Sequence, residues 1–193
     1  MTIQIGYFVG SLSSTSINRI LSRALIRLAP EDMDFTELPI GNLPLYSPDY
    51  DANYPAEAQA LKASIAAVDA VLFVTPEYNR SIPGALKNAI DWASRPWGQN
   101  SFEHIPAAVI GASVGQIGTA MGQQSLRGVL SFCNARQMTS PEAYIQYSPE
   151  VFQDDGHVTQ DSTREFLTAY MAEFRTYIGM VLTVLPRSRE PEV

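Results

Sequence analysis

The amino-acid sequence predicts an α/β fold in which a five-stranded parallel sheet carries helices on both of its faces. Short apolar runs of strand length alternate with segments whose apolar residues recur at helical spacing, which is typical of parallel strands joined by crossover helices. The length of 193 residues fits one domain that spans residues 1–193. A hydrophobic fraction of 46% with 17% charged residues excludes a disordered chain.

Each predicted element follows from the spacing of its apolar residues. Short continuous apolar runs suit strands that are covered on both faces, and apolar residues every three or four positions suit helices. Prolines lie at several of the predicted helix boundaries, as expected for a residue that cannot occupy a helix interior without cost. In order, the sequence predicts a strand at Ile3–Val9, a helix at Ile17–Leu28, a strand at Asp34–Leu38, a helix from Pro55 to Ala67, a strand at Asp69–Thr75, a helix that opens at Pro83, a strand at Ile105–Ala112, a helix that carries Leu126, Val129, Leu130 and Cys133, a short strand near Met138–Ile145, and a last helix that carries Leu167, Tyr170, Met171, Phe174 and Ile178.

This order of elements predicts the flavodoxin-like, doubly wound strand order 2-1-3-4-5. In such folds ligands bind outside the carboxyl ends of the strands, where three loops would meet: residues 10–17, 76–82 and 113–118. The stretch Pro39–Tyr54 is predicted to be a long surface loop, and loops of that length tend to be functional. Its aspartates, Asp49 and Asp51, suit a solvated loop better than the mouth of a pocket.

Charge and cysteine content narrow the classes of function. Thirteen Lys and Arg residues against twenty Asp and Glu give a net charge of −7, which disfavours a nucleic-acid partner. No apolar stretch approaches the ~20 residues of a membrane span, and a first basic residue at Arg19 does not suit a signal peptide. The single cysteine, Cys133, excludes an internal disulfide, so we expect a cytoplasmic protein with no membrane partner. The two histidines lie in no metal-binding pattern, and no metal site is predicted.

The first of the three loops has the composition of a phosphate site. Residues 10–18 hold five hydroxyl side chains and lead into a helix N-terminus, where free amides and the helix dipole favour an anion. The loop has neither a Gly-Lys-Ser/Thr sequence nor a GxGxxG pattern, so it predicts neither an ATP site nor a dinucleotide site of the usual kind. A plain helix cap by Ser16 or Thr15 explains the same hydroxyls equally well.

The other two loops suggest different chemistry. Residues 76–82 are stiffened by prolines and dense in polar groups, which suits a planar heterocycle, although an ordinary turn capped by Ser81 is the simpler alternative. The third loop contains a G-x-S-x-G sequence centred on Ser113, the nucleophile pattern of serine hydrolases, with Asp154 or Asp155 and His157 as partners. Such a nucleophile is followed directly by a helix, whereas residues 116–118 prolong the loop here, so a serine hydrolase remains the alternative.

Two of these loops resemble a known family. The sequences Gly10-Ser11-Leu12-Ser13-x-x-Ser16-x-Asn18 and Pro76-Glu77-Tyr78-Asn79-x-Ser81-Ile82-Pro83-Gly84-x-Leu86-Lys87-Asn88-Ala89-Ile90-Asp91-Trp92 resemble the NAD(P)H-dependent FMN reductases. That family includes quinone, chromate and azo-dye reductases of the flavodoxin-like fold. The resemblance covers roughly the first two-thirds of the chain and fades after Met138.

The resemblance implies a bound FMN and NADPH or NADH as co-substrate. The first loop would hold the 5′-phosphate, the second would edge the isoalloxazine ring, and the third would lie on the other flank of the ring. Relatives often carry Arg or Lys where Ser13 and Ser14 stand here, so phosphate affinity would rest more on backbone amides and Arg19. The cofactor-binding residues expected are Ser11, Leu12, Ser13, Ser16, Ile17, Asn18, Pro76, Glu77, Tyr78, Asn79, Arg80, Ser81, Ser113 and Gly115.

The same resemblance implies an enzyme of defined type. It would transfer hydride from NAD(P)H through N5 of FMN to a quinone-like, chromate, azo or free-flavin acceptor, and no catalytic residue is assigned because the cofactor supplies the redox chemistry. Arg80 stands where relatives often have an aromatic or small residue, and it would favour a negatively charged nicotinamide cofactor or acceptor. A flavodoxin-type electron carrier is a further alternative. The resemblance also implies a homodimer or homotetramer, and in such enzymes the site often lies near the subunit interface.

Overall fold

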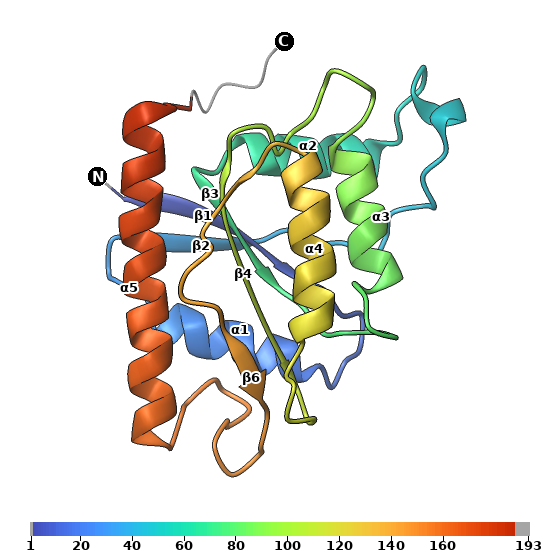
Figure 1. The fold of residues 1–193 in the computed structure, drawn as a ribbon. Helices are drawn as coiled ribbons and strands as arrows, with labels where there is room; N and C mark the ends of the chain where they lie inside the picture. Colours follow the sequence, from blue (N-terminus) through green and yellow to red (C-terminus); the bar gives the residue numbers. More distant parts are fainter. Residues whose placement is uncertain (1, 188–193) are drawn as a thin grey trace.

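A computed structural model describes residues 2–187, and it confirms the predicted parallel sheet (Figure 1). The order of the strands is β2-β1-β3-β4-β5, as predicted, and a sixth strand pairs with β4. Every strand pair in the sheet is parallel, so the carboxyl ends of the central strands lie at one edge. The strands are β1 (Ile3–Val9), β2 (Met33–Glu37), β3 (Ala70–Val74), β4 (Pro106–Ser113), β5 (Arg136–Gln137) and β6 (Tyr144–Gln146).

The last position of the sheet is divided between two short strands. The single strand predicted near Met138–Ile145 is wrong: β5 pairs with the start of β4, β6 pairs with its end, and the chain between them leaves the sheet. That intervening stretch contains Pro141, which has no N–H to donate to a ladder and is therefore unsuited to a strand interior. β2 and β4 also lie one residue away from their predicted bounds.

Within the described residues, five α-helices cover the sheet. The structure confirms the predicted helices, but Pro55 and Pro83 lie at the N-cap positions immediately before two of them rather than inside. A single turn of 3₁₀-helix, η1 (Pro48–Tyr50), interrupts the predicted long loop. The helices are α1 (Ile17–Leu28), α2 (Ala56–Ala66), α3 (Gly84–Ala93), α4 (Ala120–Phe132) and α5 (Asp161–Val184).

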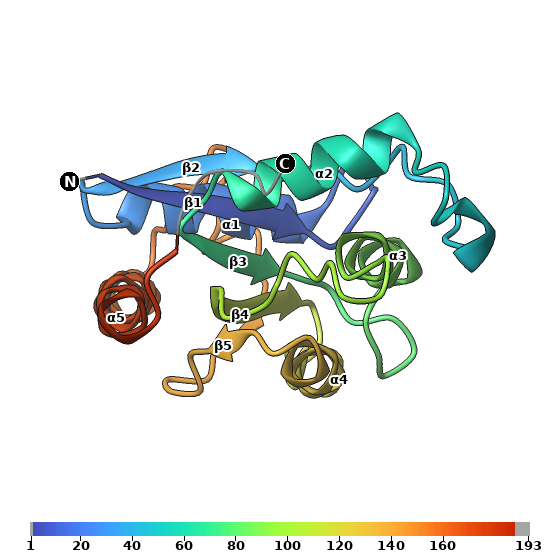
Figure 2. The same cartoon turned by 90° about the horizontal axis from the view of Figure 1, so that it is seen from above.

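The core has two layers, one on each face of the sheet. Buried residues of α1 and α5 pack on one face together with β4 residues such as Ile110, and buried residues of α2, α3 and α4 pack on the other. Figure 2, a view from above, shows α5 on one side of the sheet and α3 and α4 on the other. β3 is buried along its whole length because both of its faces are covered. Cys133 lies in the second layer, buried as a small core residue.

The loop that connects β2 to α2 is fastened to α3 rather than solvated along its length. Trp92, fully buried on α3, donates its indole N–H to the carbonyl oxygen of Pro44 at 2.7 Å. The rings of Tyr46, Tyr50 and Tyr54 surround the same indole at centroid distances of 5.1, 5.7 and 4.9 Å. Most of the stretch is exposed, as expected for a surface loop, and the aromatic packing on Trp92 holds it in place.

Candidate functional site

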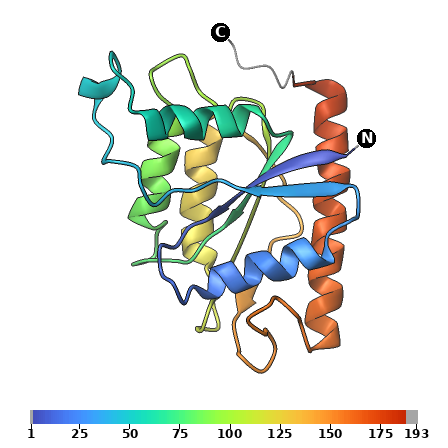
Figure 3. The same cartoon turned by 180° about the vertical axis from the view of Figure 1, so that it is seen from behind.

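The three loops predicted to meet at the carboxyl edge of the sheet do meet there, around a cavity of about 270 Å³. In Figure 3 the chain after β1 turns into the start of α1 at this lower edge of the molecule, close to the loops that follow β3 and β4. All three loops contribute to the lining. The lining residues are Ser11, Thr15, Ser16, Ile17, Asn18, Pro76, Glu77, Tyr78, Ala112, Ser113 and Val114.

The first loop presents hydroxyl groups and helix amides to this cavity. Ser16 is the N-cap of α1, and its hydroxyl accepts a hydrogen bond from the backbone N–H of Arg19 at 3.3 Å. Ser11 is buried, and its hydroxyl accepts from the N–H of Ser13 at 3.2 Å. The N–H groups in the first turn of α1 have no intrahelical acceptor, and the helix dipole adds partial positive charge there. This end of the cavity therefore suits a phosphate.

Asn18 connects the first loop to the third. Its side-chain amide donates to the carbonyl oxygen of Ala112 and accepts from the N–H of the same residue, both at 2.9 Å. Asn18 is 1% exposed, so this pair of bonds is shielded from water. The amide therefore fixes the start of α1 against the end of β4, and its role in the site is to position the two loops.

Arg19 lies beside this loop but is held away from it by Glu37 on β2. The two guanidinium nitrogens donate to the two carboxylate oxygens of Glu37 at 2.7 and 2.9 Å, a bidentate pair. These bonds are the main reason that the pKa of Glu37 lies below its usual range. A hydrogen bond from the hydroxyl of Tyr7 lowers the pKa further, by less. The contribution of Arg19 to phosphate binding expected from the sequence is not supported, since its guanidinium is already paired. None of the lining residues given above is a lysine or arginine, so an anion in the cavity would rely on hydroxyls and amides.

The second loop ends in a tight turn. The backbone N–H and C=O of Tyr78 and Ser81 exchange hydrogen bonds of 3.0 Å, and the two residues between them, Asn79 and Arg80, have φ values of 51° and 64°. Two successive positive φ values define a type I′ turn. Tyr78 lines the cavity and is 50% exposed, so part of the residue is accessible to a ligand.

Glu77 fastens the second loop to the helix that follows the third. One carboxylate oxygen accepts from the N–H of Gly122 in the first turn of α4 at 2.9 Å, where the helix dipole favours negative charge. A side chain on Gly122 would crowd the backbone of Glu77 at 3.3 Å, so glycine permits the close approach. Asn18 and Glu77 together join all three loops into one unit.

Ser113 does not form a hydrolytic triad. Its hydroxyl donates to the carbonyl oxygens of Gly118 at 2.6 Å and Gly115 at 3.2 Å instead of to a histidine. α4 begins seven residues after Ser113, so the sharp turn directly into a helix that this nucleophile requires is not formed. Asp155 accepts a hydrogen bond from the backbone N–H of His157 and lies 3.7 Å from Arg27, which gives it a structural role in its own loop.

The sequence predicted most of the lining but not all of it. Eight of the residues expected to bind the cofactor line the cavity: Ser11, Ser16, Ile17, Asn18, Pro76, Glu77, Tyr78 and Ser113. Six expected residues lie in the same loops but outside the lining: Leu12, Ser13, Asn79, Arg80, Ser81 and Gly115. Sequence reasoning missed Thr15, Ala112 and Val114 as members of the lining. Ala112 and Val114 flank Ser113 within the G-x-S-x-G motif, and that adjacency was the available signal.

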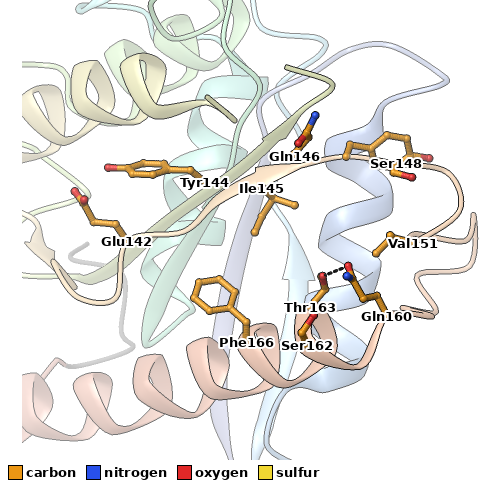
Figure 4. A pocket seen from close by; sticks show the side chains of 11 residues that line it. Glu142, Tyr144, Ile145, Gln146, Ser148, Val151, Gln160, Ser162, Thr163 and Phe166 are labelled. Carbon is orange, nitrogen blue, oxygen red and sulfur yellow. Dashed lines mark hydrogen bonds between the residues drawn. The ribbon is translucent and has the colours of Figure 1, made fainter. Parts of the chain in front are cut away.

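A larger hollow of about 740 Å³ lies elsewhere, between the segment that contains β6 and the first turns of α5 (Figure 4). It is lined mainly by amide, hydroxyl and aromatic side chains, among them Gln146, Ser162 and Phe166. Two of the residues that line the hollow are bonded to each other: the hydroxyl of Thr163 donates to the side-chain oxygen of Gln160 at 2.8 Å. None of the three converging loops reaches this hollow, so the smaller cavity is the better candidate for the functional site.

The fold and the position of the smaller cavity are those of a flavodoxin-like α/β protein, a class in which ligands bind at the carboxyl edge of the sheet. Comparison with known proteins makes this class specific. Residues 3–150 match the family model described as NADPH-dependent FMN reductase. The chain therefore belongs to the NADPH-dependent FMN reductase family, whose members are oxidoreductases with FMN as cofactor and NAD(P)H as electron donor.

Individual relatives are similar over nearly the whole chain. A 2-hydroxy-1,4-benzoquinone reductase of a Burkholderia species is 47% identical over 178 residues, which is 92% of this chain and 97% of the relative. A quinone reductase of Pseudomonas putida is 44% identical over 89% of this chain and 92% of its own. The solved structure of FerB, a flavoenzyme NAD(P)H:acceptor oxidoreductase of Paracoccus denitrificans, has a TM-score of 0.90 at 45% identity and covers 93% of this chain and 98% of its own. The similarity therefore extends well beyond Met138, where the motif resemblance ends.

Within residues 2–187 there is no helix with the length and apolar character to cross a bilayer. The same part of the chain brings together no group of three or more His, Cys, Asp and Glu side chains able to hold a metal ion.

Proposed function

We propose that this enzyme reduces quinones at the expense of NAD(P)H and that its FMN occupies the cavity formed by the three loops. The observation that carries the proposal is the meeting of a hydroxyl-rich helix N-terminus with Tyr78 and Val114 in one cavity. The helix N-terminus suits a phosphate, and Tyr78 and Val114 suit a flat, partly apolar ring. Bound FMN supplies the hydride chemistry, and the chain supplies binding, orientation and shielding from water.

In this proposal each loop has a separate task. Ser11, Ser16 and the first amides of α1 hold the phosphate, Pro76–Ser81 forms the edge of the isoalloxazine ring, and Ser113–Gly115 covers its other flank. Asn18 and Glu77 keep the three loops at fixed separations through their bonds to Ala112 and Gly122. Fixed loops lower the entropic cost of ordering the site when a ligand binds.

The quinone class of acceptor is supported by the names of the relatives and by the surface around the cavity. Leu12 in the first loop and Val114 and Ile117 in the third are 61%, 74% and 52% exposed, so these two loops offer apolar contact to a flat acceptor. Chromate, azo compounds and free flavins are the other acceptors to compare. The rate with each acceptor at equal NADPH concentration decides among them, and a quinone rate lower than all the others would overturn the proposed class.

The exposed apolar residues of the first and third loops also support a homo-oligomer. Exposed apolar surface commonly marks an interface, and Met121 at the start of α4, which follows the third loop, is 44% exposed as well. We infer a homodimer or homotetramer, in a cytoplasmic setting that suits the single buried Cys133. Light scattering on the FMN-loaded protein would measure the mass directly, and a monomer at all concentrations would contradict the inference.

The experiment for the function itself is steady-state turnover. FMN-loaded protein is mixed with NADPH or NADH and 1,4-benzoquinone in the absence of oxygen, and nucleotide oxidation is followed. The proposal predicts sustained turnover that needs both the nucleotide and the quinone. Protein that retains FMN but never oxidises either nucleotide would instead be an electron carrier.

A further inference from the structure

We propose that Arg80 binds a phosphate group of the nicotinamide co-substrate, and this inference rests on the proposed function. Arg80 lies at the tip of the type I′ turn formed by Tyr78–Ser81, next to the cavity but outside its lining. A phosphate held by Arg80 would therefore belong to a molecule that lies across the cavity mouth. FMN, in contrast, has its phosphate end assigned to the loop at Ser11 and Ser16.

The conformation of Arg80 is one that its residue type disfavours. Its φ of 64° belongs to the left-handed region, where glycine is the usual residue at the second central position of a type I′ turn. A non-glycine side chain there costs of the order of 1 kcal/mol. The turn would form more readily with glycine, so the arginine contributes something other than turn stability.

The guanidinium of Arg80 is also more available than the other basic groups close to the three loops. Its side chain is 67% exposed, and its ion pair with Glu77 is long, at 3.5 Å. Glu77 uses its other carboxylate oxygen on the N–H of Gly122. Arg19, by comparison, makes two short bonds to Glu37, and Lys87 makes bonds of 2.7 and 2.8 Å to Asp91.

The chemistry of the co-substrate matches this group. NADH carries a pyrophosphate and NADPH a further 2′-phosphate, whereas simple quinones are uncharged. Arginine is well suited to phosphate because its planar group donates two parallel hydrogen bonds. In a chain with a net charge of −7, an exposed guanidinium next to the cavity would also offset the general repulsion of a polyanion.

The test compares three variants of the FMN-loaded enzyme. Arg80→Gly keeps the turn because glycine accepts the positive φ, and Arg80→Lys keeps the charge. Arg27→Gln is the matched control: Arg27 is 54% exposed, its ion pair with Asp155 is also long at 3.7 Å, and it lies in the last turn of α1, at the end opposite Ser16. The control removes the same charge as Arg80→Gly.

Two measurements are made on each variant. The first is kcat and KM for NADPH and for NADH with saturating 1,4-benzoquinone, and the second is the calorimetric Kd for NADP⁺, which binds without reacting. For Arg80→Gly we expect KM for NADPH and Kd for NADP⁺ to rise about tenfold, as for the loss of one charge-assisted hydrogen bond, with kcat retained. Arg80→Lys should recover most of this loss, and Arg27→Gln should match the unaltered protein.

The pattern of loss identifies which phosphate is bound. A rise confined to NADPH assigns the 2′-phosphate, and an equal rise with NADH assigns the pyrophosphate. Unchanged KM and Kd in Arg80→Gly would overturn the inference, as would a lower kcat with unchanged KM, which would mean that Arg80 serves only to steady Glu77. Failure of the unaltered protein to retain FMN or to oxidise NADPH would instead overturn the proposed function.

Discussion

At the scale of single residues, the polar side chains around the cavity divide into those available to a ligand and those used to join the loops. Asn18 is fully engaged with Ala112, and Arg19 with Glu37, although both stand in or beside the sequence that resembles a phosphate loop. Ser16 is available in part, because its hydroxyl accepts one long bond from Arg19 while also lining the cavity. A residue in a binding motif can therefore serve the motif's shape without touching the ligand.

Ser16 allows the phosphate site to be tested separately from the helix cap. Aspartate is as good an N-cap as serine, so Ser16→Asp should leave the stability of the apoprotein nearly unchanged. Its carboxylate would lie close to the phosphate, and like charges ~4 Å apart repel strongly enough to weaken FMN binding by at least about 100-fold. Quenching of FMN fluorescence measures the affinity, and Ser16→Ala serves as the control without added charge. Tight FMN binding by Ser16→Asp would contradict the assigned phosphate site.

At the scale of elements, close backbone approach matters as much as side-chain chemistry. Gly111 on β4 faces the carbonyl oxygen of Thr75 and the hydroxyl of Thr119, and a Cβ atom at this position would overlap both. Thr75 follows β3 directly and leads into the second loop, and Thr119 precedes α4. Gly111 therefore sets how closely the second and third loops approach each other. In the sequence this glycine stands out only as part of the G-x-S-x-G motif, which suggests a serine hydrolase and not a packing role.

Two alanine substitutions test this packing. Gly111→Ala should lower the free energy of unfolding by about 2 kcal/mol or more, as overpacked positions do, and should also weaken FMN binding. Gly128→Ala on α4 has open space around it and should raise stability by up to about 1 kcal/mol, since alanine favours the helix. Urea unfolding measures both values. If the two substitutions changed the free energy of unfolding equally, the close contacts of Gly111 would not be what makes alanine unfavourable there.

The bidentate pair between α1 and β2 gives a predicted dependence on pH. The pKa of Glu37 is lowered in the folded protein, mainly by hydrogen bonds from Arg19, so the unfolded chain takes up a proton more readily than the folded one. The stabilisation is present above the ordinary glutamate pKa of about 4.3 and is lost as the pH falls through the lower folded value. Relative to Arg19→Met we expect about 1 kcal/mol of extra stability at pH 7. That difference should shrink on acidification in urea unfolding experiments, and a constant difference from pH 7 to pH 3 would contradict the assignment.

At the scale of the whole molecule, the strand order and the three converging loops could be predicted in two steps. Apolar spacing reports which segments are strands and helices, and a chain that alternates between them in this way follows the doubly wound order. The contacts that assemble the site could not, since Asn18 and Ala112 are 94 positions apart and no local pattern links them. The divided edge formed by β5 and β6 was missed for a similar reason: strands of two and three residues are too short to show a period. The packing of Tyr46, Tyr50 and Tyr54 on Trp92 likewise depends on tertiary contacts.

An anaerobic titration of the FMN-loaded protein with NADPH, followed by the visible absorbance of the flavin, shows whether the bound FMN accepts hydride from the nucleotide and passes it on. The account predicts a protein-bound flavin band that bleaches as NADPH is added and returns when 1,4-benzoquinone follows. A band that NADPH and NADH both leave unchanged would contradict the account, and so would protein that retains no flavin after incubation with FMN.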